Sequence, residues 1–436
     1  MRDFLPEDVR RRQYVIGVIA DVYQKYGFEP LETPAVENLA TLQGKYGEEG
    51  DRLIFKILKR GEGGETGQAD LALRYDVTVP LARVVAEYRA KLPKYFKRYQ
   101  IQPVWRADRP QKGRFREFYQ CDADAIGSTA PVVETEVLAA ASDVMLALGF
   151  REFDILLNHR QLLAGLLRGA GVATELHGDA LVAIDKKDKI GEGGVAKELS
   201  DRGISDDAAM RLLSWAGASW RPDWLDWLEA QFPSLDEAGR AGVKNLRDIG
   251  RLAESTSAAG HIKIEPSLAR GLSYYTGAIF EIKVADLAGS LGGGGRYDNL
   301  IGMFSGEHVP ACGISLGLER ILVVMGERNM FPQSVVSVPA DVMVVQWFAD
   351  RTNLYLSFAT ELRQAGLRVE LYPDAPVEDG KKVGDKQFKY ASARGIPFVA
   401  VIGADELANG TVTVKNMKTG EQKSVARAET VKWLNS

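Results

Sequence analysis

Apolar residues recur at helical spacing over residues 6–27, and this is the first clear pattern along the chain. The spacing predicts a helix whose buried face carries Val15, Val18, Ile19, Val22 and Tyr26. Pro6 suits a first helical position, and Gly27 is a natural stop. Two prolines within residues 28–34 then predict extended chain, because a residue before proline avoids the helical region.

Short apolar runs separated by polar turns follow. Their spacing predicts short strands at 53–58 and 71–73 around a glycine-rich turn at 61–64, a helix at 80–88, two long strands at 94–106 and 115–126, and a helix at 131–149. The two long strands, joined by a polar loop, are typical of a hairpin.

Residues 165–255 change character, because their pattern is mostly helical with glycine breaks. Four of the seven tryptophans lie in this stretch: Trp215, Trp220, Trp224 and Trp227. We expect them to fill a small separate core, with base stacking as the alternative.

Strand patterns return from residue 278. We expect strands at 278–284 and 311–316, a helix at 317–326 and a linker at 332–339. The glycine run 292–295 indicates a close strand approach beneath a ligand rather than a phosphate cradle. The last hundred residues alternate strand and helix, which predicts a compact α/β domain with strands at 342–347, 368–371, 397–402 and 411–416 and helices at 354–365 and 382–394.

The composition excludes several classes of protein. Of the 436 residues, 45% are hydrophobic and 26% charged, which is ample material for packed cores. A net charge of −4 argues against a globally basic nucleic-acid binder. Two cysteines, Cys121 and Cys312, rule out a disulfide scaffold and suit a reducing compartment. Four isolated histidines, without Cys-x-x-Cys or His-x-x-x-His spacing, exclude a zinc site built from these residues.

The sequence contains no evident export or membrane signal. Residues 1–6 lack the apolar stretch of a signal peptide. No uncharged apolar run approaches the ~20 residues of a membrane span. We therefore expect a soluble, cytoplasmic protein.

Positive charge is concentrated in residues 94–116, although the chain is acidic overall. This segment holds eight Lys or Arg residues against one acid, Asp108. A solvated basic surface is the simplest interpretation of such a run. Arg106, however, lies among apolar residues of a predicted strand, where a guanidinium needs an anionic partner such as phosphate.

Two further arginines, Arg270 and Arg320, stand beside glycines and could join Arg106 at one polyphosphate. The sequence leaves their convergence open. The common nucleotide-binding patterns, Walker A and Gly-x-Gly-x-x-Gly, are absent. So are the Gly-x-Ser-x-Gly elbow and the protein-kinase motifs.

Five segments together carry a family resemblance. Residues 96–118 and 313–320 resemble the second and third motifs of the class II aminoacyl-tRNA synthetases. Residues 27–34 resemble the first motif, whose proline lies at the dimer interface in that class. Residues 73–80 and 270–277 are similar to signatures of the histidyl-tRNA synthetase family. The resemblance covers essentially the whole chain.

The resemblance implies an α+β fold: an antiparallel sheet flanked by helices, with a helical insertion and a C-terminal α/β anticodon-binding domain. It divides the chain into a catalytic core in two parts (1–164 and 256–330), a helical insertion near the tRNA acceptor arm (165–255), a linker (331–340) and the anticodon-binding domain (341–436). It also implies a homodimer.

The activity implied by the resemblance joins L-histidine to ATP with the help of Mg²⁺ and passes the product to the histidine tRNA. The substrate's own carboxylate is then the nucleophile, which agrees with the lack of a nucleophile motif. Catalysis would rest on positioning and on stabilising negative charge. By similarity, the catalytic residues are Arg106, Arg270 and Arg320, and the ATP site also includes Asp108, Phe118 and Arg114.

Seven residues match or adjoin the histidine-binding positions of the family: Asp76, Val77, Thr78, Gln120, Asp124, Tyr274 and Tyr275. Asp76, Thr78 and Gln120 match ammonium positions, and Asp124 and Tyr275 match imidazole positions. Structural alternatives stay open, because Asp76 could cap the following helix and Asp124 could be an ordinary strand-end acid. One of the two tyrosines is expected in the core, and Tyr275 is the preferred ligand.

The sequence departs from the family at Ser273, where Asp is usual, so a network around Arg270 would be rearranged. Three alternatives stay open: a synthetase-like paralogue that regulates histidine biosynthesis, an RNA-binding sensor, and a class II synthetase for another amino acid. The intact arginines disfavour the first two, and the Arg-Gly-Leu and Tyr-Tyr signature disfavours the third.

The predicted anticodon-binding domain is nearly neutral. Residues 341–436 carry 13 Lys or Arg and 12 Asp or Glu. We therefore expect tRNA recognition there by base reading more than by bulk charge. A candidate phosphate-contacting face, or else a merely solvated one, consists of Lys381, Lys382, Lys386 and Lys389.

Overall fold

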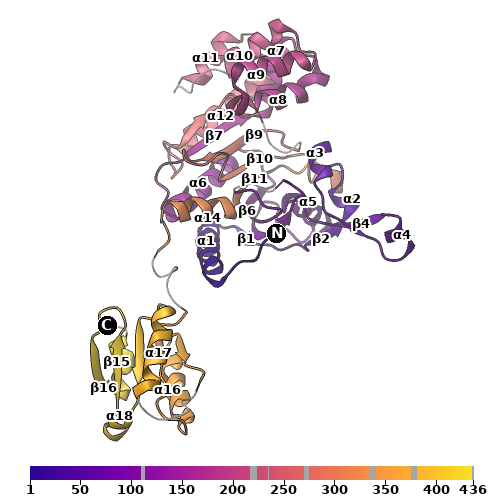
Figure 1. Cartoon of the computed structure of the whole chain (residues 1–436). Helices are drawn as coiled ribbons and strands as arrows, with labels where there is room; N and C mark the ends of the chain where they lie inside the picture. Colours follow the sequence, from indigo (N-terminus) through magenta and orange to yellow (C-terminus); the bar gives the residue numbers. More distant parts are fainter. Residues whose placement is uncertain are drawn as a thin grey trace. The chain divides into compact units, whose positions relative to one another are not determined.

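The chain forms two compact units, residues 1–331 and 332–436 (Figure 1). This computed structural model describes residues 1–109, 113–216, 223–233, 235–269, 274–332, 335, 339–374 and 381–434. Each unit has its own hydrophobic clusters of buried side chains. Among the described helices, none combines the length and the apolar character that crossing a membrane requires.

An eight-stranded sheet organises the first unit (Figure 1). Its strands, in spatial order, are β1 Glu29–Pro30, β5 Phe96–Trp105, β6 Glu117–Ile126, β11 Ala311–Gly317, β10 Gly292–Arg296, β9 Ala278–Lys283, β7 Asp154–His159 and β8 Ile262–Ile264. The interior pairs are antiparallel, whereas the two edge pairs, β1 with β5 and β7 with β8, are parallel. The predicted antiparallel sheet is therefore mixed at its edges.

Strands β5 and β6 are the longest pair in this sheet. They run antiparallel from Phe96 opposite Ile126 to Trp105 opposite Glu117, which confirms the predicted hairpin. The strands expected at 278–284 and 311–316 are confirmed as β9 and β11, and the glycine run is β10. The sequence analysis missed β7 and β8.

A layer of helices covers one face of the sheet. Helix α1 (Pro6–Lys25) packs against α6 (Val132–Ala147) and α14 (Leu318–Glu327), and all three contact β6. Val15 and Ile19 of α1 are buried in the core that they share. The apolar stripe read from the sequence is thus the face that packs on the sheet.

A second hydrophobic cluster lies around helix α5 (Thr78–Glu87). It includes parts of a three-stranded sheet of β2 (Val36–Asn38), β4 (Ala69–Leu73) and β3 (Lys56–Leu58). Short helices complete this region: α2 Leu39–Leu42, α3 Gly47–Arg52, α4 Glu62–Glu65 and α13 Gly302–Ser305. The turn predicted at 61–64 is wrong in part, because Gly61, at φ 68°, leads directly into α4.

The predicted helical stretch is present as α7 Arg160–Ala170, the 3-10 turn η1 Thr174–Leu176, α8 His177–Ile184, α9 Lys187–Asp201, α10 Asp206–Ala216, α11 Trp224–Gln231 and α12 Glu237–Ala253. Helix α12 packs against α7 and also against α6 and β7 of the sheet region. Trp215 and Trp224 are buried, as expected, while Trp220 lies outside the described residues. The separate core is wrong, because both side chains belong to the same cluster as the sheet's core.

The second unit contains a five-stranded sheet in the order β13-β12-β14-β15-β16. The strands are β12 Val342–Val344, β13 Val369–Leu371, β14 Phe398–Val401, β15 Thr411–Asn416 and β16 Gln422–Ala426, and the helices are α16 Thr352–Gln364, α17 Lys381–Ala393, α18 Ala404–Asn409 and α19 Thr430–Leu434, with a 3-10 turn η2 at Arg427–Glu429. The expected strand–helix alternation is confirmed; β16, α18 and α19 were missed. On α17, Lys386 and Lys389 are exposed, and the side chains of Lys381 and Lys382 lie outside the described residues.

Candidate active site

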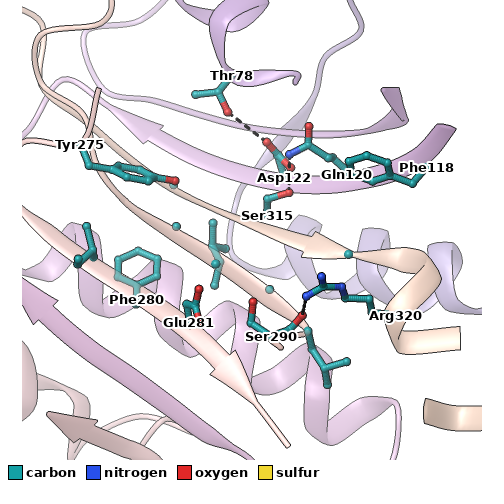
Figure 2. A pocket seen from close by; sticks show the side chains of 18 of the residues that line it. Thr78, Phe118, Gln120, Asp122, Tyr275, Phe280, Glu281, Ser290, Ser315 and Arg320 are labelled. Carbon is teal, nitrogen blue, oxygen red and sulfur yellow. Dashed lines mark hydrogen bonds between the residues drawn. The ribbon is translucent and has the colours of Figure 1, made fainter. Parts of the chain in front are cut away.

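A cavity of about 390 Å³ opens on the large sheet and is lined by residues of β6, β9, β10 and β11. Figure 2 shows side chains from β6, β9, β11, α5 and α14 pointing toward it. Its walls combine apolar side chains with convergent arginine, carboxylate and amide groups, as small-molecule sites do. Most of the residues predicted from the sequence meet here.

Strand β6 supplies the floor of the cavity, because alternate residues of a strand face the same side. Gln120, Asp122 and Asp124 all line it. Asp124 lies opposite Gly313 of β11, and a Cβ at Gly313 would lie 1.9 Å from the Asp124 Oδ1 atom. Gly313 therefore leaves the space that the Asp124 carboxylate fills.

The glycine strand β10 permits a similarly close approach. A Cβ at Gly294 would lie 2.1 Å from the Gly313 carbonyl oxygen. Gly292, Gly293 and Gly294 line the cavity from β10. The run is therefore a tightly packed strand under the cavity, as the sequence indicates.

Two of the three predicted catalytic arginines line the cavity, and the third, Arg270, lies outside the described residues together with Ser273. The Arg106 Nε atom donates to the Tyr75 carbonyl at 3.1 Å, and its guanidinium lies 5.1 Å from the centre of the Phe118 ring. Arg320 donates to the Gly113 carbonyl and to the Ser290 carbonyl, and Figure 2 shows the second of these bonds. Backbone carbonyls thus orient both guanidinium groups.

The predicted ATP residues Asp108, Arg114 and Phe118 also line the cavity. Arg114 pairs with Asp108 at 3.0 Å, so these two side chains join the beginning and the end of the loop between β5 and β6. Phe118 is half-buried, and Figure 2 shows its ring beside Gln120. The ring and the Asp108–Arg114 pair are therefore both part of the site.

Asp76 lies behind the cavity wall rather than on it. Its Oδ1 atom accepts from the Tyr46 hydroxyl and the Val79 amide, both at 3.0 Å, and its Oδ2 atom accepts from the Tyr274 hydroxyl at 3.1 Å. Burial raises the pKa of Asp76, and these donors oppose the shift. The residue at the N-cap of α5 is Val77, so Asp76 is not the cap itself, although its carboxylate accepts from the Val79 amide in the first turn. Thr78 itself lines the cavity.

Asp124 is held by two neighbours. Arg98 pairs with its Oδ2 atom at 2.9 Å, and the Tyr297 hydroxyl donates to Oδ1. Burial raises the pKa of Asp124, and the Arg98 charge counteracts the rise. The Arg98 guanidinium also donates to the Val77 carbonyl at 3.1 Å, which gives Val77 a backbone role.

Arg98 corrects the surface interpretation of the basic segment. It is completely buried on β5, directly opposite Asp124 on β6. Lys97, the next residue, faces the other side of the strand and pairs with Glu136 at 2.6 Å. The basic side chains of residues 94–116 therefore have different places: some lie in a buried ion pair, some line the cavity and some lie on the surface of the protein.

The two tyrosines differ in what their hydroxyl groups do. Tyr274 is buried and donates to Asp76, whereas Tyr275 is half-buried and Figure 2 shows it reaching toward the middle of the cavity. Burial, followed by the charge of Asp122, raises the pKa of Tyr275, so its hydroxyl stays a proton donor at neutral pH. Both residues line the cavity, with Tyr275 in the more open position.

Asp122 is one of the site residues that the sequence analysis missed, together with Glu281 and Ser315. It lies between Gln120 and Asp124 on the same face of β6, and Figure 2 shows it between Thr78 and Ser315. Burial and the neighbouring Asp124 raise the pKa of Asp122 to about 7. The alternation of Gln120, Asp122 and Asp124 in a predicted strand was the signal that could have identified it.

The carboxylates of the cavity suit a magnesium ion that arrives with a nucleotide. No group of three or more His, Cys, Asp or Glu side chains able to hold a metal ion occurs in the described ranges. Magnesium bound to phosphates needs only one or two carboxylates from a protein. Glu319 is engaged with Arg12 and the Tyr119 amide, at 2.8 and 3.0 Å. Glu281 also lines the cavity and lies beside Ser290 (Figure 2).

The fold is that of a class II aminoacyl-tRNA synthetase. A solved histidyl-tRNA synthetase from Nostoc sp. PCC 7120 is similar over 100% of this chain and 97% of its own, with a TM-score of 0.81 and 31% identity. The fold of the apo S. aureus histidyl-tRNA synthetase is also similar, with a TM-score of 0.70 at 21% identity, and covers 100% of this chain and 98% of its own.

Sequence comparisons define the family within that class. Residues 1–321 match the family model described as histidyl-tRNA synthetase, and residues 341–436 match that of an anticodon binding domain. A histidine–tRNA ligase of Flavobacterium johnsoniae is 43% identical over 97% of this chain and 95% of its own length. One of Porphyromonas gingivalis is 44% identical with the same coverage. The chain belongs to the histidyl-tRNA synthetase family.

Proposed function

We propose that this chain is a histidine–tRNA ligase, which activates L-histidine with ATP and transfers it to the histidine tRNA. One observation carries the proposal: Arg106 and Arg320 meet a row of amide and carboxylate side chains in a single cavity. Guanidinium groups match phosphate oxygens, and the polar row matches an amino acid. Family membership supports the same activity.

In the first step, a carboxylate oxygen of histidine attacks the α-phosphorus of ATP, and the bond to pyrophosphate breaks. The protein supplies no nucleophile in this scheme. Arg106 binds the α-phosphate and the histidine carboxylate, Arg320 binds the γ-phosphate, and Arg270 approaches the α-phosphate from the other side. Preorganised positive charge of this kind stabilises the transition state without further rearrangement.

The adenine end of ATP is assigned to the loop between β5 and β6. Phe118 stacks on the ring, Asp108 accepts from the adenine amino group, and Arg114 contacts the phosphates. For Arg114 to contact the phosphates, its side chain must leave Asp108 and bind ATP instead. Mg²⁺ bound to the phosphates would use Glu281 and would neutralise phosphate charge.

Histidine selection follows from hydrogen-bonding groups that a wrong side chain would leave unpaired. We assign the ammonium subsite to Thr78 and Gln120, and the imidazole subsite to Asp124 and Tyr275. Tyr274 and Asp76 support these residues from behind, and Val77 does so through its carbonyl. Sites of this kind discriminate by a factor of about 10⁴ or more without editing.

In the second step, the terminal ribose hydroxyl of the tRNA attacks the carbonyl of the adenylate and AMP leaves. Residues 165–255 and 341–436 are the tRNA-binding parts of the proposal, which rests for the latter on the anticodon-domain match. We further infer a cytoplasmic homodimer: the two cysteines are free, and residues 27–34 resemble the dimer motif. Light scattering of the purified chain tests the dimer.

The proposal predicts a loss of function when either described arginine is removed. Arg106→Ala or Arg320→Ala should lower the rate of histidine-dependent ATP–pyrophosphate exchange by about 100-fold or more, because each stabilises phosphate charge. Arg328→Ala is the matched control, since Arg328 lies at the end of α14 and pairs with Asp286 on the surface. Its rate should stay within about twofold of the wild type. Normal exchange in both cavity variants would contradict the assignment.

A further inference from the structure

Arg106 contacts one neighbouring residue, Tyr75, in two ways. Its Nε atom donates to the Tyr75 carbonyl at 3.1 Å, and its guanidinium lies over the Tyr75 ring, 4.3 Å from the ring centre. The Phe118 ring is farther from the guanidinium, at 5.1 Å, and in the proposed function it stacks on adenine. Tyr75 therefore provides an aromatic face for Arg106 that ATP does not need.

Tyr75 lies behind Arg106 rather than in the cavity. Arg106 lines the cavity, and Tyr75 is not among the described residues that do so. Tyr75 is only 5% exposed, and its ring packs on the Tyr46 ring with 4.4 Å between the ring centres. A side chain in this position does not reach the substrates, so its influence on the reaction passes through Arg106.

The chain is anchored on both sides of Tyr75. The Arg74 guanidinium donates to the Pro103 carbonyl at 2.8 Å, and the Arg74 carbonyl accepts from the Trp105 amide at 3.1 Å. On the other side, the Asp76 carboxylate accepts three hydrogen bonds. The ring and the carbonyl of Tyr75 are therefore fixed groups, against which a long and flexible arginine side chain can be held in one orientation.

A contact through the face of the ring suits a guanidinium that must bind anions. The negative face of an aromatic ring attracts a cation above it. Because the contact uses the flat face of the guanidinium, the N–H groups in its plane stay directed at ligands. Asp108 lines the same cavity, and its carboxylate would attract an Arg106 side chain that was free to turn.

We propose that Tyr75 is a positioning residue for Arg106: its ring face and its main-chain carbonyl hold the guanidinium in the orientation that binds the α-phosphate and the histidine carboxylate. The inference rests on the proposed function, in which Arg106 stabilises negative charge on the α-phosphate. Preorganised charge accelerates a reaction only while it stays in place, and a displacement of about 1 Å can cost a large part of the rate.

Two variants separate the ring face of Tyr75 from its hydroxyl group. Tyr75→Phe keeps the face, Tyr75→Leu removes it, and both keep the main-chain carbonyl. In Tyr75→Leu the kcat of histidine-dependent ATP–pyrophosphate exchange should fall by about 10-fold, because Arg106 is correctly oriented for less of the time. In Tyr75→Phe it should stay within about twofold of the wild type. An unchanged kcat in Tyr75→Leu, or an equal loss in both variants, would overturn the inference.

Binding of L-histidinol shows whether the rest of the site is intact. This analogue keeps the amine and the imidazole of histidine and lacks the carboxylate that Arg106 binds in the proposal. Its Kd, from calorimetry on the full chain, should change by less than about threefold in Tyr75→Leu. A loss of histidinol affinity as large as the loss of kcat would show general damage and would overturn the specific role. If Tyr75→Leu does not fold, Tyr75→Met takes its place, because the flexible methionine side chain fills irregular space.

A double-variant cycle tests whether Tyr75 acts through Arg106. In the Arg106→Ala chain, Tyr75→Leu should lower kcat by less than about twofold, because the group that it orients is gone. An equal loss with and without Arg106 would contradict the inference. Failure of the proposed function has a different signature: the wild-type chain itself would show no histidine-dependent exchange, and the inference would fall with it.

Discussion

At the scale of single residues, the cavity owes its chemistry to charges that the fold has taken out of water. Asp76, Asp122 and Asp124 are each no more than 2% exposed, and burial raises the pKa of all three. Arg98 offsets the charge of Asp124, so the two neighbouring carboxylates can coexist on one strand. The remaining negative charge is available to a cationic ligand.

This arrangement has a cost for stability that depends on pH. The pKa of Asp122 is about 7 in the folded chain and near 3.8 ordinarily, so the folded state binds more protons between those values. The wild-type chain therefore loses stability as pH rises through this window. The pKa of the Asp122 carboxyl also depends on four neighbours, which all remain in the Asp122→Asn variant: Asp124, Asp76, Arg98 and Ser315.

Asp122→Asn should accordingly be stabilising in the absence of ligands at pH 8 but not at pH 4. We expect the difference in Tm between variant and wild type to be larger at pH 8 by about 2–4 °C or more. Differential scanning calorimetry at the two pH values measures it. A difference that is independent of pH would show that Asp122 does not carry a buried charge.

At the scale of elements, the site depends on close contact between neighbouring strands. Helix α1 also contributes, because Arg12 pairs with Glu319 of α14 at 2.8 Å, and the same carboxylate accepts from the Tyr119 amide of β6. One buried ion pair thus fixes the strand that carries Gln120 and Asp122 to the helix that carries Arg320. The geometry of the floor follows from these contacts.

Gly313→Ala tests the strand contact directly. The added Cβ would overlap the Asp124 carboxylate, so we expect the KM for histidine to rise by about 10-fold to 100-fold. Gly326→Ala is the control, since this glycine in α14 has open space around its Cβ position and alanine favours helix. Its KM should not change. Pyrophosphate-exchange kinetics would contradict the account if both variants behaved alike.

The elements that the sequence predicted are those with strong local patterns. The hairpin of residues 96–126 and helix α1 could be predicted because many residues repeat the same alternation. The three-residue strand β8 has too few residues for a pattern. The burial of Arg98 could not be read locally either, because it depends on the register that sets Arg98 opposite Asp124.

The site residues also divide into those that a local sequence motif identifies and those that only tertiary packing reveals. Motif positions such as Arg106, Gln120 and Arg320 could be located from the sequence, and they line one cavity. The engagement of Asp124 by Tyr297, 173 positions away, and of Asp76 by Tyr274, 198 positions away, depends on tertiary packing alone. That packing determines which of the buried carboxylates is engaged by other side chains of the protein.

At the scale of the whole molecule, the two units have separate cores and carry separate tasks in the proposal. The residues that line the cavity all lie between Thr78 and Arg320, within the first unit. Residues 1–331 alone should therefore retain histidine-dependent pyrophosphate exchange within about tenfold, while charging of histidine tRNA falls by about 100-fold or more as anticodon contacts are lost. Loss of both activities together in a folded fragment would contradict this division.

The central claim is that one cavity activates histidine with ATP. ATP–pyrophosphate exchange with each of the twenty amino acids, on the full chain and without tRNA, tests it most directly. We predict exchange with histidine and background levels with the other nineteen, because the polar row of the cavity leaves its groups unpaired with any other side chain. Exchange with a different amino acid, or binding of histidine without any exchange, would contradict the account.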